Sequence, residues 1–70
     1  MSKPDWSEAP EWAQWLAQDM SGVWVWYFGG VPYPQDTMWR PKSDGQGFKY
    51  KRASEGEMNI HWKETLERRP

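Results

Sequence analysis

The sequence predicts a small α+β domain: an N-terminal helix packed on a three-stranded antiparallel β-meander, with a short C-terminal helix. Residues 10–20 show the apolar spacing of an amphipathic helix, and residues 23–28 are rich in β-branched and aromatic side chains. Residues 48–52 alternate between aromatic and basic side chains, as a half-buried strand does. The 70 residues allow one domain spanning 1–70, in which 1–8 form a loose lead-in.

The predicted helix over residues 10–20 begins at Pro10, a residue that suits the first helical turn. Its apolar residues recur at positions i, i+3, i+4 and i+8, and they are Trp12, Trp15, Leu16 and Met20. Gly22 follows and can end a helix in the left-handed conformation.

The run Val23 to Phe28 is the first predicted strand, and it contains no charge and no turn residue. Side chains alternate along a strand, so one face carries Val23, Val25 and Tyr27, and the other carries Trp24, Trp26 and Phe28. Both faces are apolar. The predicted helix can cover one of them, and the second needs a further cover or a partner.

Two further strands are expected at 37–40 and 48–52. Pro32 and Pro34 keep the preceding residues extended, and Asp44-Gly45 favours a tight hairpin turn between the two strands. In the last strand we expect Phe48 and Tyr50 inward, with Lys49 and Lys51 outward. The connections are too short for parallel crossovers, which predicts a meander. Asn59 is the expected cap of a final helix in which Trp62 and Leu66 lie one turn apart.

The composition argues against several functional classes. There is no cysteine for a disulfide or thiolate site, and His61 is the only imidazole, so we expect neither a metal nor a cofactor. The carboxylates form no obvious acid–base pair, and Gly45-x-Gly47 is too short for a phosphate-binding loop, so an enzyme is the least favoured class. No secretory signal and no apolar run of membrane-spanning length is present, and we expect a cytoplasmic protein.

The charges are unevenly distributed along the chain, although the formal net charge is only −1. Acidic residues dominate up to residue 38. Residues 39–52 then carry five cations against the single acid Asp44, and these cations are Arg40, Lys42, Lys49, Lys51 and Arg52. Aromatic residues are interleaved with these cations.

Three stretches resemble a group of small tryptophan-rich proteins encoded by tailed phages and prophages. They are Ala9-Pro10-Glu11-Trp12-Ala13-Gln14-Trp15-Leu16-Ala17-Gln18-Asp19, Gly22-Val23-Trp24-Val25-Trp26-Tyr27, and Trp62-Lys63-Glu64-Thr65-Leu66-Glu67-Arg68-Arg69-Pro70. The resemblance covers the two ends and the first strand, and not residues 29–58. It implies a phage accessory protein that acts in the cytoplasm of a bacterial host, and it carries over no functional residue.

The hypothesis we favour is a non-catalytic protein–protein interaction module with an aromatic and basic surface. Its expected contact residues are Trp24, Trp26, Trp39 and Arg40, since tryptophan and arginine are enriched at interface hot spots. The partner is a host or phage protein, or a second copy of the chain. The alternative is single-stranded nucleic acid, bound through Lys49, Tyr50, Lys51 and Arg52. In a purely structural interpretation the tryptophans fill the core and the lysines solvate an edge strand.

Overall fold

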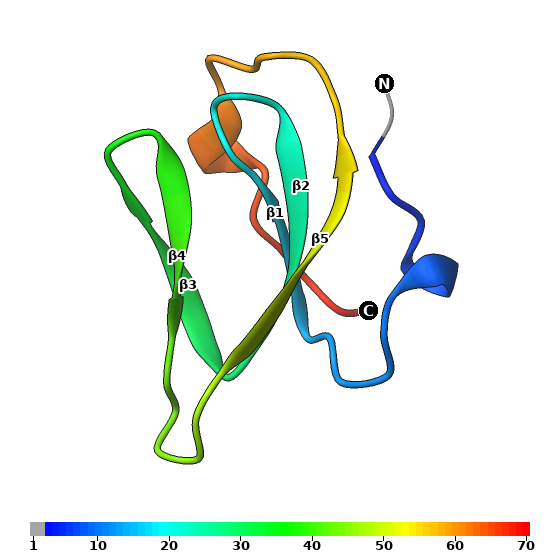
Figure 1. Ribbon diagram of the computed structural model, residues 1–70, viewed down its shortest axis with the longest axis vertical. Coiled ribbons are helices and arrows are strands. Elements are labelled where there is room, and N and C mark those ends of the chain that lie inside the picture. The colour runs from blue at the N-terminus through cyan, green and yellow to red at the C-terminus, as the bar shows by residue number, and fades with distance from the viewer. Residues whose placement is uncertain (1–2) are drawn as a thin grey trace.

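The computed structural model describes residues 3–70, and its regular secondary structure is almost entirely antiparallel β-strand (Figure 1). The larger sheet has the strand order β5–β2–β1–β6, with β1 at Trp15–Gln18, β2 at Val23–Phe28, β5 at Lys49–Glu55 and β6 at Glu67–Arg68. The smaller sheet is a hairpin of β3 (Gly30–Gln35) and β4 (Met38–Lys42). Two 3₁₀ turns complete the described chain, η1 at Trp6–Glu8 and η2 at Trp62–Glu64.

Strand β2 lies at the centre of the larger sheet and has the predicted bounds, Val23–Phe28, so that prediction is confirmed. It pairs with β1 on one side and β5 on the other. Its alternating side chains enter two separate apolar clusters. The buried members of the first are Ala17, Val25, Tyr27, Trp39 and Trp62, and those of the second are Ala13, Leu16, Trp24 and Trp26.

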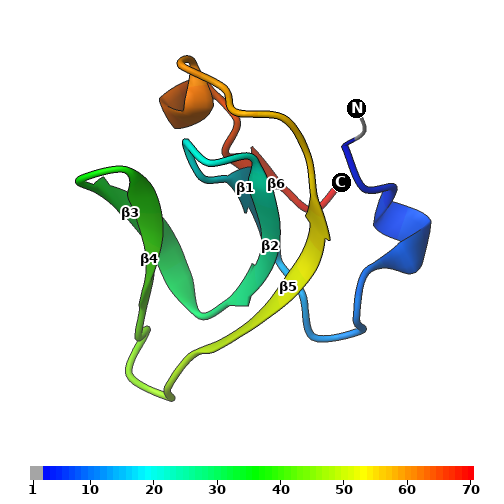
Figure 2. The same cartoon turned by 45° about the horizontal axis from the view of Figure 1, so that its top comes forward.

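Each apolar face of β2 is covered by another part of the chain. In Figure 2 the larger sheet lies between the β3–β4 hairpin on the left and the N-terminal segment on the right. On the hairpin side, Trp39 of β4 meets Trp62 of η2 edge-on, with ring centroids 5.8 Å apart. On the other side, Trp6 of η1 packs on Trp26 at a centroid distance of 5.0 Å. The described chain therefore supplies both covers itself.

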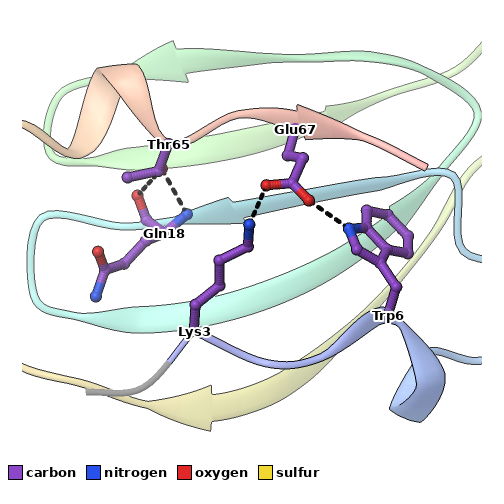
Figure 3. A network of polar contacts seen from close by, with 5 residues as sticks. All are labelled: Lys3, Trp6, Gln18, Thr65 and Glu67. Carbon is purple, nitrogen blue, oxygen red and sulfur yellow. Dashed lines mark hydrogen bonds and ion pairs between the residues drawn. The ribbon is translucent and has the colours of Figure 1, made fainter. Parts of the chain in front are cut away.

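Polar contacts hold the N-terminal segment on the sheet. Lys3 and the indole N–H of Trp6 both donate to the carboxylate of Glu67 in β6, the latter at 2.5 Å (Figure 3). These two hydrogen bonds lower the pKa of Glu67. Arg69 donates to the carbonyl oxygen of Ala13 at 2.6 Å. The first two residues of the predicted lead-in 1–8 lie outside the described range. The described part of this segment is held on the sheet through Trp6.

The predicted helix at 10–20 is wrong, because the chain forms a turn at Pro10 and then strand β1. Leu16 and Ala17 are both fully buried, one in each apolar cluster. A strand that is buried on both faces has apolar residues at neighbouring positions. When tryptophans lie on either side of such a run, the apolar residues also match the i, i+3, i+4 spacing of a helix, and periodicity alone does not distinguish the two. A lone helix of this length is marginal in water, whereas β1 exchanges hydrogen bonds with strands on both sides.

The predicted meander is also wrong. Strands at 37–40 and 48–52 are found close to their predicted positions, as β4 and β5, yet they do not pair with each other. Strand β4 pairs with β3, and β5 pairs with β2. Gly29 redirects the chain between β2 and β3 with φ +118°, and a Cβ atom there would lie 2.8 Å from the carbonyl oxygen of Lys42. The hairpin turn is at Asp36, with φ +57°, and not at Asp44-Gly45.

The predicted C-terminal helix reduces to the single 3₁₀ turn η2, after which the chain enters strand β6. Trp62 is buried against Trp39, and the residues after it pair with β1, so backbone hydrogen bonding ends the turn early. Residues 3–70 contain no helix of sufficient length and apolar character to cross a membrane.

Gln18 at the end of β1 joins three segments. Its side-chain amide donates to the carbonyl oxygen of Gly22 at 3.0 Å and accepts from the amide of Asn59 at 3.0 Å. Its backbone N–H donates to the hydroxyl of Thr65 at 2.9 Å, as Figure 3 shows. Gln18 is buried, so these hydrogen bonds replace the water that the amide would otherwise bind.

Candidate functional site

A cleft lies between the two sheets, where β4 and β5 diverge. Its volume is about 200 Å³. Buried residues of β2, of β4 and of the turn directly after β1 form the floor, and residues of β4 and β5 form the walls. The floor residues are Asp19, Val25, Tyr27 and Trp39, and the wall residues are Met38, Arg40, Pro41 and Tyr50.

The floor of the cleft is held by two polar contacts to the backbone of β4. The carboxylate of Asp19 accepts the N–H of Trp39 at 2.9 Å, and the hydroxyl of Tyr27 donates to the carbonyl oxygen of Trp39 at 3.4 Å. Burial raises the pKa of Asp19, and the hydrogen bond from Trp39 partly offsets this effect. Burial, and then the charge of Asp19, raise the pKa of Tyr27, so its hydroxyl stays a donor.

The ring of Tyr50 lies in the wall of the cleft, and the ring of Phe48 lies beside it. Phe48 and Tyr50 stack with ring centroids 6.3 Å apart and planes inclined by 12°. They are 48% and 62% exposed, so the expectation that they point inward is wrong. Strand β5 is at the edge of its sheet, and the hairpin that buries β2 does not extend over these two rings.

The cations of the basic segment fall into two groups. Arg40 and Lys42 are exposed on β4 and make no ion pair among residues 3–70. Arg52 pairs with Glu55 at 3.3 Å, but both side chains are largely exposed and such a pair contributes little. Lys49 points to the other face, where its ammonium lies 5.9 Å from the ring centre of Trp12. Lys51 is exposed on that same face, opposite Trp26.

The three tryptophans expected at an interface are buried. Trp24, Trp26 and Trp39 retain 7%, 3% and 5% of their exposure. Trp24 and Trp26 face the N-terminal segment, and Trp39 lies in the floor of the cleft. Of the predicted contact residues, the structure therefore brings Trp39, Arg40 and Tyr50 together in one cleft and places the other two tryptophans away from it.

Several other apolar side chains are exposed that the sequence did not predict to be at a surface site. Val31 and Tyr33 are exposed on β3, where they line a separate pocket with Pro41 and Lys42, and Met38 lies on β4 in the wall of the cleft. Met58 and Ile60 project from the loop that Gln18 anchors. The sequence signal for the first group was the alternation of Val31 and Tyr33 with prolines, which marks a strand with one buried and one exposed face.

His61 is exposed, and its Nδ1 lies 3.8 Å from a carboxylate oxygen of Glu64. Within residues 3–70, no three acidic, histidine or cysteine side chains come together in a way that could hold a metal ion. No family model matches the chain, and comparison with curated proteins and with solved structures likewise returns no match.

Proposed function

We propose that this chain is a non-catalytic binding module that recognises another protein through the aromatic and basic rim of the cleft. We define this rim surface as Phe48, Tyr50, Arg40, Lys42 and Met38. The observation that carries the proposal is the exposed stack of Phe48 and Tyr50 beside uncompensated cations. Tyrosine, arginine and methionine at a concave site are the composition of protein interface cores.

The neighbouring hairpin supports a protein rather than a small ligand as the partner. Val31 and Tyr33 expose further apolar area on β3, in a separate pocket with Pro41 and Lys42, and the cleft itself is small for a ligand site. The buried tryptophans support the surface indirectly. Trp39 fixes β4 against β1 and β2 and so sets the position of Arg40.

The resemblance of the two ends and of β2 to tryptophan-rich phage proteins suggests the setting. We propose that the chain is a phage or prophage accessory protein that acts in the bacterial cytoplasm on a host or phage protein. No cofactor enters this function.

The test is affinity capture from an infected host lysate treated with nuclease, followed by quantitative mass spectrometry. The double variant Phe48→Ser/Tyr50→Ser should lose the captured partner, since two hot-spot aromatics contribute at least about 2 kcal/mol, or roughly thirtyfold in affinity. Met58→Ser/Ile60→Ser is the matched control, because it removes two apolar side chains elsewhere that are even more exposed. Equal capture by both double variants would contradict the proposal.

Single-stranded nucleic acid is the second candidate, and the parallel arrangement of Phe48 and Tyr50 favours it, because stacked rings accept bases. Lys51 and Arg52 would then contact phosphates. Fluorescence anisotropy with a labelled oligonucleotide should show binding at low salt that weakens steeply as salt rises. No binding at low salt would exclude this candidate.

A further inference from the structure

The β3–β4 hairpin leaves little backbone for another strand to pair with. Pro32 and Pro34 have no N–H to donate along β3, and Pro41 has none in β4. The outward N–H of Trp39 donates to Asp19, and its carbonyl oxygen accepts from Tyr27. Side chains of the larger sheet thus occupy the edge of β4 that faces the cleft.

The two edges of the larger sheet differ. Strand β6 has only two residues, too few for a stable strand pairing on its outer side. Strand β5 has seven residues and contains no proline. It pairs with β2 residue by residue from Lys49 to Arg52, and Ala53 then forms a bulge that interrupts the regular edge.

The hydrogen-bond pattern shows which groups of β5 face outward. Asp19 donates to the carbonyl oxygen of Val23, so Val23, Val25 and Tyr27 direct their backbone groups toward β1. The alternate residues of β2 direct theirs toward Lys49 and Lys51 of β5. It follows that Tyr50 and Arg52 present their N–H and C=O groups at the open edge. Among residues 3–70, no side chain or other strand pairs with them there.

The charges at the open edge of β5 determine which kind of strand can pair with it. Lys49, Lys51 and Arg52 are all exposed along four residues, and the side chains of Lys49 and Lys51 lie on the face of the sheet away from the cleft. A second copy that paired through the same edge would bring these cations together, which is destabilising. An acidic strand would place carboxylates among them. Lysines on an edge strand thus disfavour self-pairing and favour a partner of opposite charge.

We infer that an acidic, extended segment of a partner protein adds to β5 as a fifth strand, by hydrogen-bonding to the backbone of Tyr50 and Arg52. This inference rests on the proposed protein-binding function and specifies its ligand. The bulge at Ala53 limits the pairing to about four residues, a short strand. The rings of Phe48 and Tyr50 then cover the side chains of the added strand that face the cleft.

The test uses the full chain and two probes, a fluorescent peptide of alternating glutamate and valine and the same peptide N-methylated at its four central residues. The methylated peptide keeps the charge and side chains and loses the backbone donors. We expect it to bind at least tenfold more weakly. Hydrogen exchange followed by NMR should show the amides of Tyr50 and Arg52 slowed at least tenfold by the first peptide.

Two protein variants sharpen the test. Lys51→Glu should weaken binding of the first peptide at least tenfold, whereas Lys63→Glu, an exposed lysine on η2, should leave it unchanged. Equal binding of both peptides, with no slowing at Tyr50 and Arg52, would overturn strand addition and leave the rim surface as a side-chain binding site.

Three other results would also overturn the inference. The first is no binding of either peptide while partner capture still depends on Phe48 and Tyr50, which leaves the proposed function standing. The second is slowing at Tyr50 and Arg52 with a doubled solution mass when no peptide is present, which would assign the edge to a second copy. The third is displacement of the peptide by an oligonucleotide that binds more tightly.

Discussion

Tyr27 and Tyr50 lie directly opposite each other on neighbouring strands of one sheet, on the same face, and yet their surroundings differ completely. Tyr27 is 2% exposed, packs in the cluster with Trp39 and Trp62, and donates to the backbone of β4. Tyr50 is 62% exposed and contacts Phe48 at the rim. Both residues lie in paired antiparallel strands, so secondary structure alone does not explain the difference in exposure. It arises because the β3–β4 hairpin covers β1 and β2 and ends before β5.

This comparison separates the aromatic residues by role. The tryptophans of β2, β4 and η2 supply the area that a chain of this size, without disulfides, needs in its core. The aromatics of β5 add little to the core and remain accessible. The tryptophans that first suggested an interaction surface therefore belong mainly to the core, and the exposed aromatics of this segment are Phe48 and Tyr50.

The largest effect should come from truncating Tyr27, and the same truncation at Tyr50 is its control. Tyr27→Ala removes a fully buried ring and its hydrogen bond and should cost about 3–5 kcal/mol, enough to unfold most of the protein. Tyr50→Ala should change the free energy of unfolding by less than about 0.5 kcal/mol. Urea denaturation followed by tryptophan fluorescence measures both. Similar losses for the two variants would remove the distinction between the buried and the exposed aromatic sets.

An intermediate effect is expected at Gln18, which organises the polar side of the buried region. Gln18→Ala removes one of the two donors to the carbonyl oxygen of Gly22, which keeps the N–H of Gly56, and leaves the amide of Asn59 without its partner, so it should cost about 2–3 kcal/mol. Gln14→Ala, at an exposed position of the same segment, is the control and should be neutral. Hydrogen exchange should report faster opening of the loop that carries Met58. An unchanged loop in Gln18→Ala would show that packing alone holds it.

The smallest effect concerns Asp19 in the floor of the cleft. Its pKa is raised by folding above the ordinary value of 3.8, so the stability it contributes is full below pH 3.8 and falls as pH rises through the raised pKa. Asn at this position keeps an oxygen that accepts the N–H of Trp39 and carries no charge. Asp19→Asn should therefore equal or exceed the wild type in stability at neutral pH, by no more than about 1 kcal/mol.

The measurement for Asp19→Asn is urea denaturation from pH 3.5 to 8, with Asp36→Asn at the exposed hairpin turn as the control. The advantage of Asp19→Asn over the wild type should shrink toward low pH. A variant that is less stable than the wild type at neutral pH, with a gap that closes on acidification, would show that the ionised carboxylate stabilises the floor.

Local pattern determined the parts of this protein that depend on one strand alone. The run Val23–Phe28, its bounds, and the division of its side chains between two apolar faces follow from alternation, because neighbouring residues on a strand must point to opposite sides. Extended segments near β4 and β5, and the basic character of this half of the chain, follow in the same way. The pairing of these strands does not follow from the sequence, since several antiparallel arrangements satisfy the same alternation.

Only the tertiary structure decided which segments meet. Trp15–Gln18 became a strand because β2 and the distant β6 both offer hydrogen bonds to it, a gain that helical spacing cannot show. The N-terminal segment covers the second apolar face of β2, and the hydrogen bond from Trp6 to Glu67 connects this segment to the other end of the chain. Hydrogen-bond partners and burial are properties of contacts between distant residues, so the identity of the exposed aromatics, and with it the candidate surface, emerged only from the folded chain.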